Sequence, residues 1–291
     1  MSDEILLAKS QFVVRRNKKR SSSGYLIQIY AALLIFFVVI VCALLPQFIS
    51  PYDPYDIDPS ISFQPPSVHH WFGTDQSGRD TLSRVIYGTR FSLFIGFLSI
   101  ITALVLGALL AFLSQFRSKV VSHIVERTID ILFSFPGIIL ALICIAIFGS
   151  SAVTLGLAVG IGSAGGYARI IRTQTRLVTE AGYVSAVRML GYSPAHILFF
   201  TILPNIIRPL LPLFTLGVGQ CIVWATGLSF LGIGVQPPQA EWGALLADSR
   251  NYTSVAWWLT VFPGAMIALT SLSLTLLGRH LQSIFDSRGH E

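Results

Sequence analysis

Residues 183–205 read YVSAVRMLGYSPAHILFFTILPN, and they interrupt a chain that is otherwise largely apolar. Four residues of the first half recur at helical spacing: Tyr183, Val184, Val187 and Leu190. This spacing predicts a short amphipathic helix over about residues 181–190. Long apolar segments precede and follow the stretch. It therefore indicates a short helix that lies across the end of a bundle of longer apolar helices.

A glycine turn is expected to fix the end of this short helix. Gly191 stands where the helix should stop, because glycine adopts the left-handed turn conformation without a steric cost. Pro194 prevents the first helix from simply continuing. A second helix should follow and be broken again near Pro204. A helix held in this way suits a docking surface for another protein.

The composition indicates a protein that spans a membrane several times. Of the 291 residues, 53% are hydrophobic and only 12% are charged, and the mean hydropathy is +0.68. Soluble domains rarely have such a composition. The net charge of +6 does not argue for nucleic acid, because the basic residues are divided among short loops. The three cysteines lie in apolar segments and are interpreted as buried free thiols: Cys42, Cys144 and Cys221.

Six apolar segments have about the 20 residues that a helix needs to cross a bilayer. Their approximate ranges are 25–48, 91–114, 129–148, 151–171, 208–231 and 255–277. The fold class predicted from them is an all-α membrane protein with six transmembrane helices. The fourth segment is rich in glycine, which predicts close helix contacts inside the bundle. Kinks are expected near Pro136 and near Pro209 and Pro212.

The segments divide the chain into regions with a predicted orientation. Lysine and arginine concentrate on the side that holds both termini, and this bias places both termini in the cytoplasm. The first apolar segment is too long for the core of a signal peptide and is interpreted as a retained span. The predicted regions are a basic cytoplasmic segment (1–24), a first transmembrane helix (25–48), an extracytoplasmic segment (49–90), a five-helix core (91–280) with a cytoplasmic loop at about 172–205, and a cytoplasmic tail (281–291).

The extracytoplasmic segment begins with a stretch rich in proline and aspartate, which predicts an irregular extended strap. Thr74 or Asp75 is then a candidate helix cap. Asp75 and Arg79 are four residues apart with the acid first, as are Asp80 and Arg84, the favourable order for pairs on a helix. An amphipathic helix at the outer surface is therefore expected to lead into the second span.

The sequence lacks the motifs of several kinds of chemistry. It contains no G-x-x-x-x-G-K-[S/T] phosphate loop, no histidine and cysteine pairs at zinc-ligand spacing and no G-x-S-x-G elbow. No ATP site, metal site or catalytic residue is therefore predicted in this chain. His69 and His70 are interpreted as surface or interface residues. The spans also lack a row of Asp, Glu or His that could relay protons, which counts against a proton-driven secondary transporter.

The 183–205 stretch resembles the cytoplasmic coupling loop of ATP-binding-cassette (ABC) importer permeases. The matching residues are Ser185, Ala186, Val187, Gly191, Leu203, Pro204 and Asn205, with serine where the family often has glutamate. The residues predicted to couple to the ATPase are those of the motif together with the neighbouring Arg188 and Pro194, namely Ser185, Ala186, Val187, Arg188, Gly191 and Pro194.

Two further stretches resemble motifs of the dipeptide, oligopeptide and nickel branch of this family. The first comprises Gly73, Thr74, Asp75, Gly78, Arg79, Asp80, Ser83 and Arg84. The second comprises Gln236, Pro237, Pro238, Glu241, Trp242 and Gly243. Glu241, Trp242 and Gly243 are candidate contacts with a binding protein or with a partner subunit.

The resemblance implies the second, C-type permease subunit of a type I importer in the bacterial cytoplasmic (inner) membrane. It implies a B-type permease as heterodimer partner, two ATPase subunits that bind ATP and Mg²⁺, and an extracytoplasmic binding protein. Short peptides are the first expectation for the substrate, followed by nickel or another metal chelate and by cationic antimicrobial peptides. Two other classes stay open, namely a secondary transporter or channel and a membrane anchor without a translocation path.

Overall fold

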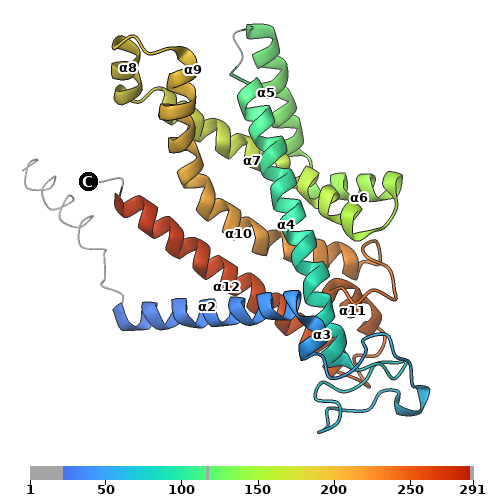
Figure 1. Cartoon of the computed structure of the whole chain (residues 1–291). Helices are drawn as coiled ribbons and strands as arrows, with labels where there is room; N and C mark the ends of the chain where they lie inside the picture. The colour runs from blue at the N-terminus through green and yellow to red at the C-terminus, as the bar shows by residue number, and fades with distance from the viewer. Residues whose placement is uncertain (1–21, 116–117, 289–291) are drawn as a thin grey trace, which may run out of the picture.

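The structure is a computed structural model that describes residues 22–115 and 118–288 (Figure 1). The described part is built of helices joined by loops. They are α2 (Ser22–Leu44), α3 (Pro46–Ile49), η1 (Pro59–Ile61), α4 (Thr81–Leu113), α5 (Lys119–Ser134), α6 (Gly137–Phe148), α7 (Ala152–Thr179), α8 (Gly182–Met189), α9 (Pro194–His196), η2 (Ile197–Ile202), α10 (Leu203–Phe230), α11 (Trp242–Ser249) and α12 (Trp258–Arg288). The all-α class predicted from the sequence is confirmed.

Four helical segments of the described part are long and apolar enough to cross a membrane. They are Gly24–Leu44, Thr81–Leu113, Pro194–Phe230 and Trp258–Phe285. The bent pair formed by α5 and α6 would count as a fifth if the two helices make one span. The glycine-rich α7 falls outside this set. The expected number of six spans therefore stays a prediction.

The most extensive helix contact is between α4 and α7. Helix α10 packs against both of these helices, and α6 packs against α7. Ile95 and Ile100 of α4 are fully buried there, as is Ala158 of α7. Small residues bring these two backbones together, because a Cβ atom at Gly160 would lie 2.6 Å from the carbonyl oxygen of Ser99. The close helix contacts expected of the glycine-rich segment are thus confirmed.

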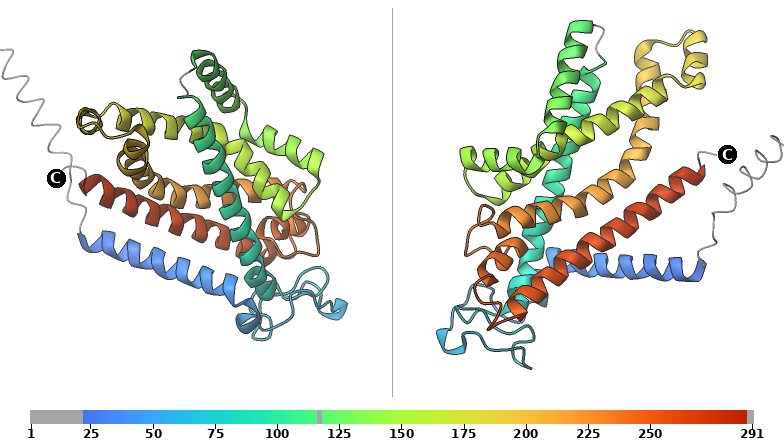
Figure 2. Two further views of the ribbon diagram at one scale, coloured as in Figure 1. Left: turned by 45° about the horizontal axis from the view of Figure 1, so that its top comes forward. Right: turned by 180° about the vertical axis from the view of Figure 1, so that it is seen from behind.

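Proline marks the breaks in the helices, although not always as the sequence suggests. The expected kink near Pro136 is a complete break, with an angle of 94° between α5 and α6. Phe135 is extended there, as expected for the residue before a proline. Pro209 and Pro212 lie inside α10, which changes direction along its length (Figure 2).

The break expected near Pro204 is wrong, because the chain stays helical from Pro194 to Phe230. The residues before α10 form instead a π-helical turn, η2, in which the N–H of Leu203 donates to the carbonyl of Leu198. This wider turn precedes Pro204, the residue that has no N–H to donate.

The two ends of the described chain lie beside one another (Figure 2). The hydroxyl of Tyr25, near the start of α2, forms a hydrogen bond of 3.0 Å with Nδ1 of His280, near the end of α12. This neighbourhood agrees with the prediction that both termini lie on one side of the membrane.

Candidate functional site

The short helix predicted over residues 181–190 is present as α8, and it projects from one end of the molecule (Figure 1). Its Val184 is fully buried against Ile197, Ile202 and Ile206 of the following helical segment. Ala186, Arg188, Met189 and Leu190 are exposed, whereas Ser185 and Val187 are half-buried. One face of α8 is therefore fixed to the body of the protein, and the opposite face is free for a partner.

The turn after α8 has the geometry that the sequence predicts. Gly191 has φ +82°, and a Cβ atom placed there would meet no atom within 4 Å. The glycine is thus required by its backbone conformation and not by a lack of space. Pro194 begins α9, where Ser193 caps the helix by accepting a hydrogen bond of 3.3 Å from the N–H of His196. The direction of the chain after α8 is therefore set by local geometry.

An aromatic stack extends the exposed end next to α8. The ring of His196 lies between those of Tyr192 and Phe200, with centroid distances of 4.7 Å on both sides. Tyr192 and Phe200 remain 49% and 72% exposed, so the stack is part of the surface.

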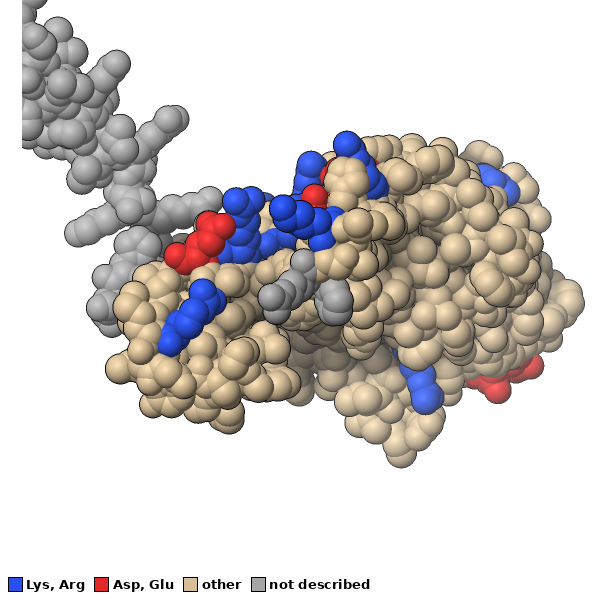
Figure 3. Space-filling model, turned by 90° about the horizontal axis from the view of Figure 1, so that it is seen from above, with Lys and Arg blue, Asp and Glu red and all other residues tan. Residues whose placement is uncertain are grey.

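Lysine and arginine side chains are visible on the largely uncharged surface of this end of the molecule (Figure 3). Some of these charges are paired: Arg172 of α7 bonds to Glu126 of α5, and Arg176 lies 2.8 Å from Glu180. Arg188 on α8 is exposed and has no ion-pair partner among the described residues. It is therefore available to an acidic partner surface.

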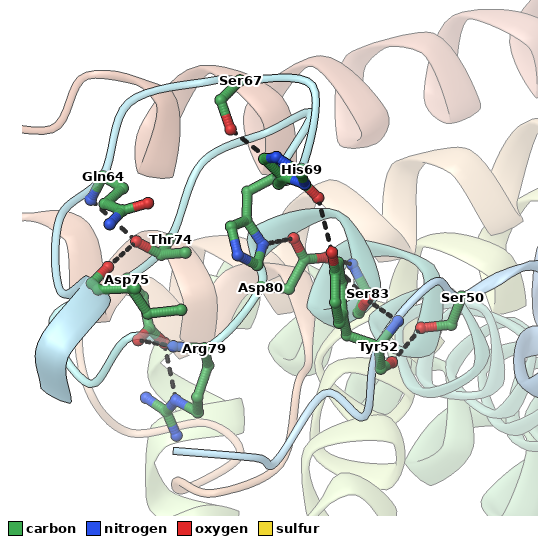
Figure 4. A network of polar contacts seen from close by, with 12 residues as sticks. Ser50, Tyr52, Gln64, Ser67, His69, Thr74, Asp75, Arg79, Asp80 and Ser83 are labelled. Carbon is green, nitrogen blue, oxygen red and sulfur yellow. Dashed lines mark hydrogen bonds and ion pairs between the residues drawn. The ribbon is translucent and has the colours of Figure 1, made fainter. Parts of the chain in front are cut away.

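The motif over residues 73–84, predicted to be extracytoplasmic and called the external motif below, forms a buried network of charges at the start of α4 (Figure 4). The Asp75 carboxylate pairs with Nε of Arg79 at 2.7 Å and with Nη1 of Arg84. It also accepts hydrogen bonds from the backbone N–H groups of Ser77 and Arg79, at 2.8 Å and 3.0 Å. Because the carboxylate and both arginines are buried, each charge depends on the others for compensation.

The predicted amphipathic helix starting at Thr74 or Asp75 is wrong. Helix α4 begins only at Thr81, its cap is Asp80, and its first turns are buried. The residues before it form a tight loop because Gly78 has φ +76° and approaches the backbone of Asp58 so closely that a Cβ atom would lie 1.8 Å from its carbonyl oxygen. Asp75 and Arg79 are paired across this loop and not along a helix.

Asp80 joins the loop that carries His70 to α4. One carboxylate oxygen caps the helix by accepting from the N–H of Ser83 at 2.8 Å, and the other forms a hydrogen bond of 2.9 Å with Nδ1 of His70. The expected helix pair between Asp80 and Arg84 is absent, since Arg84 pairs with Asp75. His70 therefore has a structural contact inside the protein, and His69 is exposed.

The structure contradicts the interpretation of Glu241, Trp242 and Gly243 as surface contacts, because all three residues are buried within the protein. Glu241 caps α11 by accepting from the N–H groups of Gly243 and Ala244, each at 2.9 Å, and from the hydroxyl of Ser92 at 3.0 Å. Burial raises the pKa of the Glu241 carboxyl, while these hydrogen bonds oppose the shift. Its role is to fix α11 to α4.

Three residues around the external motif have roles that the sequence reasoning missed. Trp258 donates from Nε1 to the carbonyl of Thr74 at 3.1 Å, and so fastens the motif to the start of α12. Ser92 links α4 to Glu241. Asp248 approaches Arg84 at 3.8 Å from α11. No local pattern signals these contacts, because each joins segments far apart in the sequence.

Comparison with known proteins places these features in a family. Residues 103–289, more than half of the chain, match the family of binding-protein-dependent transport system inner membrane components. The chain belongs to this family. Its sequence matches relatives of this permease along most of their length.

One relative of this permease is the di/tripeptide transport system permease protein DppC of Pseudomonas aeruginosa, 36% identical over 256 residues that cover 86% of this chain and 84% of the relative. Another is the probable D,D-dipeptide transport system permease protein DdpC of Escherichia coli, 37% identical over 254 residues that cover 86% and 85% of the two chains.

Two solved structures share the fold of the permease. An amino acid ABC transporter with histidines matches with a TM-score of 0.56 and 21% identity, over 71% of this chain and 94% of that chain. The MetNI methionine ABC transporter matches with a TM-score of 0.52 and 17% identity, over 68% and 96%. These identities are low, so the likeness concerns the fold, which is that of a type I ABC importer permease.

Proposed function

We propose that this permease forms half of the pathway by which an ATP-driven importer carries short peptides across the bacterial inner membrane. Its partners would be a B-type permease, two ATPase subunits that bind ATP and Mg²⁺, and an extracytoplasmic binding protein. The peptide assignment rests on the relatives, which are named as dipeptide and di/tripeptide permeases. The hydrolysis of ATP belongs to the separate ATPase subunits in this proposal.

The observation that carries the proposal is helix α8, which is anchored to the protein by one face and exposed to solvent on the other. Val184 fixes the helix to η2 and α10, so a displacement of α8 would be passed to the membrane helices and not lost in a loose loop. The exposed small side chain of Ala186 would let the helix enter a cleft on an ATPase subunit, and Arg188 would contact its rim. Closure of the ATPase pair would then rock the two permeases between their inward-facing and outward-facing states.

Purification of the tagged chain from its native membrane in a mild detergent tests this proposal. A second permease and ATPase subunits should co-purify, and the complex reconstituted in liposomes should take up short peptides only when ATP is supplied. Recovery of the chain alone, with uptake that follows a sodium gradient in the absence of ATP, would contradict the proposal and favour a secondary transporter.

A pair of variants directs the same experiment at α8. Ala186→Trp places a large side chain on the proposed docking face and should reduce the recovered ATPase by about tenfold, which corresponds to a loss of about 1.4 kcal/mol. Ala31→Trp makes the same change at an exposed position of α2, away from α8, and should retain the ATPase. Equal retention in both variants would mean that α8 is not the docking face.

A further inference from the structure

A cavity of about 440 Å³ lies beside the break between α5 and α6. Its walls come from the end of α5, the start of α6, the middle of α7 and the middle of α10. Phe133, Phe135 and Trp224 contribute aromatic rings, and Gln220 and Ser163 contribute polar groups. Its volume falls within the range of about 300–1,000 Å³ that is typical of small-molecule sites.

We propose that this cavity receives an uncharged side chain of the transported peptide, and that Gln220 binds the neighbouring peptide group. The inference rests on the proposed function and assigns to this chain the residues that select among peptides. Because the residues Phe133, Phe135 and Trp224 are 52%, 50% and 38% exposed, the cavity is open on one side. The partner permease would close it.

The chemistry of the lining matches a peptide with an apolar side chain. None of the residues that line the cavity is charged, so the site offers no ion pair to a charged side chain. Aromatic rings give a large apolar contact area, which suits aliphatic and aromatic side chains. The guanidinium of Arg169 lies outside the lining, 4.6 Å from the centroid of the Phe133 ring.

Gln220 complements the backbone of a peptide. Its amide carries both donors and an acceptor, the pair of functions that a peptide group also presents. The side chain is exposed and forms no hydrogen bond with residues 22–115 or 118–288. It is therefore free to bind one N–H and one C=O group that every peptide contains, whatever its side chains.

The broken helix argues for a substrate and against a lipid chain in this cavity. Phe135 lines the cavity and is extended, with φ −75° and ψ 134°, so the backbone at the break is not helical. Within a membrane, non-helical backbone is tolerated where it is buried in protein or lines a water-filled space, and not where it meets lipid. Secondary transporters likewise bind their substrates beside breaks in transmembrane helices.

Gly166 allows the cavity to be filled without disturbing the fold. It lines the cavity, and a Cβ atom placed there meets no atom within 4 Å. A leucine at this position would occupy part of the space proposed for the peptide side chain. Gly264 is a matched control, because it also lies in a helix with nothing within 4 Å of its Cβ position, and it does not line the cavity.

The test measures uptake of alanyl-alanine and phenylalanyl-phenylalanine by the complete complex in proteoliposomes. Gly166→Leu should lower the uptake of the phenylalanine peptide relative to the alanine peptide by about tenfold, the effect of one or two carbons of pocket space. Gly166→Ala should shift the ratio less, in the same direction. Gly264→Leu should leave the ratio at its wild-type value. An unchanged ratio in both Gly166 variants would overturn the assignment of the cavity.

A second variant tests the peptide contact. Gln220→Leu keeps a side chain of similar size and removes the amide, so both peptides should lose uptake by a similar factor of about ten. Wild-type uptake of both peptides by this variant would overturn the role of Gln220. A wild-type complex that hydrolyses ATP and transports neither peptide would overturn the assignment of peptides as the substrate. This outcome distinguishes failure of the proposed function from failure of the cavity assignment.

Discussion

At the scale of single residues, the outer end of the permease depends on ionisable side chains that are enclosed by the fold. Glu241 is 1% exposed and has hydrogen bonds from two backbone N–H groups and the hydroxyl of Ser92. Its acidic side chain and its position in an external loop suggest a surface contact. Glu241 is instead a buried helix cap. The sequence could not reveal this, because its burial depends on contact with Ser92, which is 149 positions away in the sequence.

The raised pKa of Glu241 predicts a dependence of stability on pH. Burial makes the folded protein hold this proton more tightly than the unfolded chain does. The contribution of Glu241 to stability should therefore fall as the pH rises from about 4.3, the ordinary pKa of glutamate, towards its higher folded value. Glu241→Gln, which cannot ionise, should lose this component of the decline.

Thermal unfolding of the purified complex between about pH 4 and pH 8 would measure this effect, a range that brackets the ordinary pKa of the group. Glu180→Gln is the control, because Glu180 is an exposed carboxylate paired only with Arg176. It should keep the wild-type decline of the unfolding midpoint with pH. A Glu241→Gln profile that parallels the wild type would show that Glu241 does not titrate differently in the folded protein.

At the scale of elements, the sequence correctly predicts short segments whose structure depends on local signals. It does not predict segments whose structure depends on contacts with distant residues. The period of Val184 and Val187, followed by Gly191, predicts α8 within a residue or so of its bounds. The acid–base spacing in 75–84 equally fits a helix or a loop. The loop forms because Asp75 gains backbone N–H donors there, and because Gly78 packs on Asp58 of the strap.

The site residues divide in the same way. The exposure of Ala186 and Arg188 on α8 follows from its helical period, so the sequence suffices to place them. The helix break beside the cavity is signalled by Pro136. The angle of 94° is not encoded locally, and neither is the close approach of Gly137 to Gly162 at the break.

The external motif is expected to be a stability element of the strap and α4. Asp75→Asn removes the charge that compensates Arg79 and Arg84, which would stay buried and partly uncompensated. Breaking a buried ion network in this way costs about 3–5 kcal/mol, and the complex should unfold at a clearly lower temperature. Asp56→Asn, at an exposed position of the same strap, should unfold at the wild-type temperature. Equal midpoints for the two variants would mean that the network contributes nothing to stability.

At the scale of the whole molecule, the two proposed functions, ATPase docking and peptide binding, lie at separate places that α10 connects. The proposed docking face of α8 is attached through η2 to one end of this helix, and the cavity with Gln220 and Trp224, proposed to bind the peptide, lies further along it. A movement of α8 by an ATPase subunit would therefore reach the cavity along one continuous helical segment, Pro194–Phe230. Direct passage of force in this way requires that the turn between α8 and α9 be stiff.

The measurement that tests this account most directly is the amount of peptide transported per ATP hydrolysed by a Gly191→Val complex. Valine at φ +82° strains the turn by about 1–2 kcal/mol, so transport should fall about tenfold while the ATPase subunits stay bound and continue to hydrolyse ATP. Gly182→Val, at the first residue of α8, has no positive φ and has open space at its Cβ position, so it should transport within about twofold of the wild type. Transport by Gly191→Val at the wild-type ratio would contradict the claim that α8 couples ATP hydrolysis to the permease.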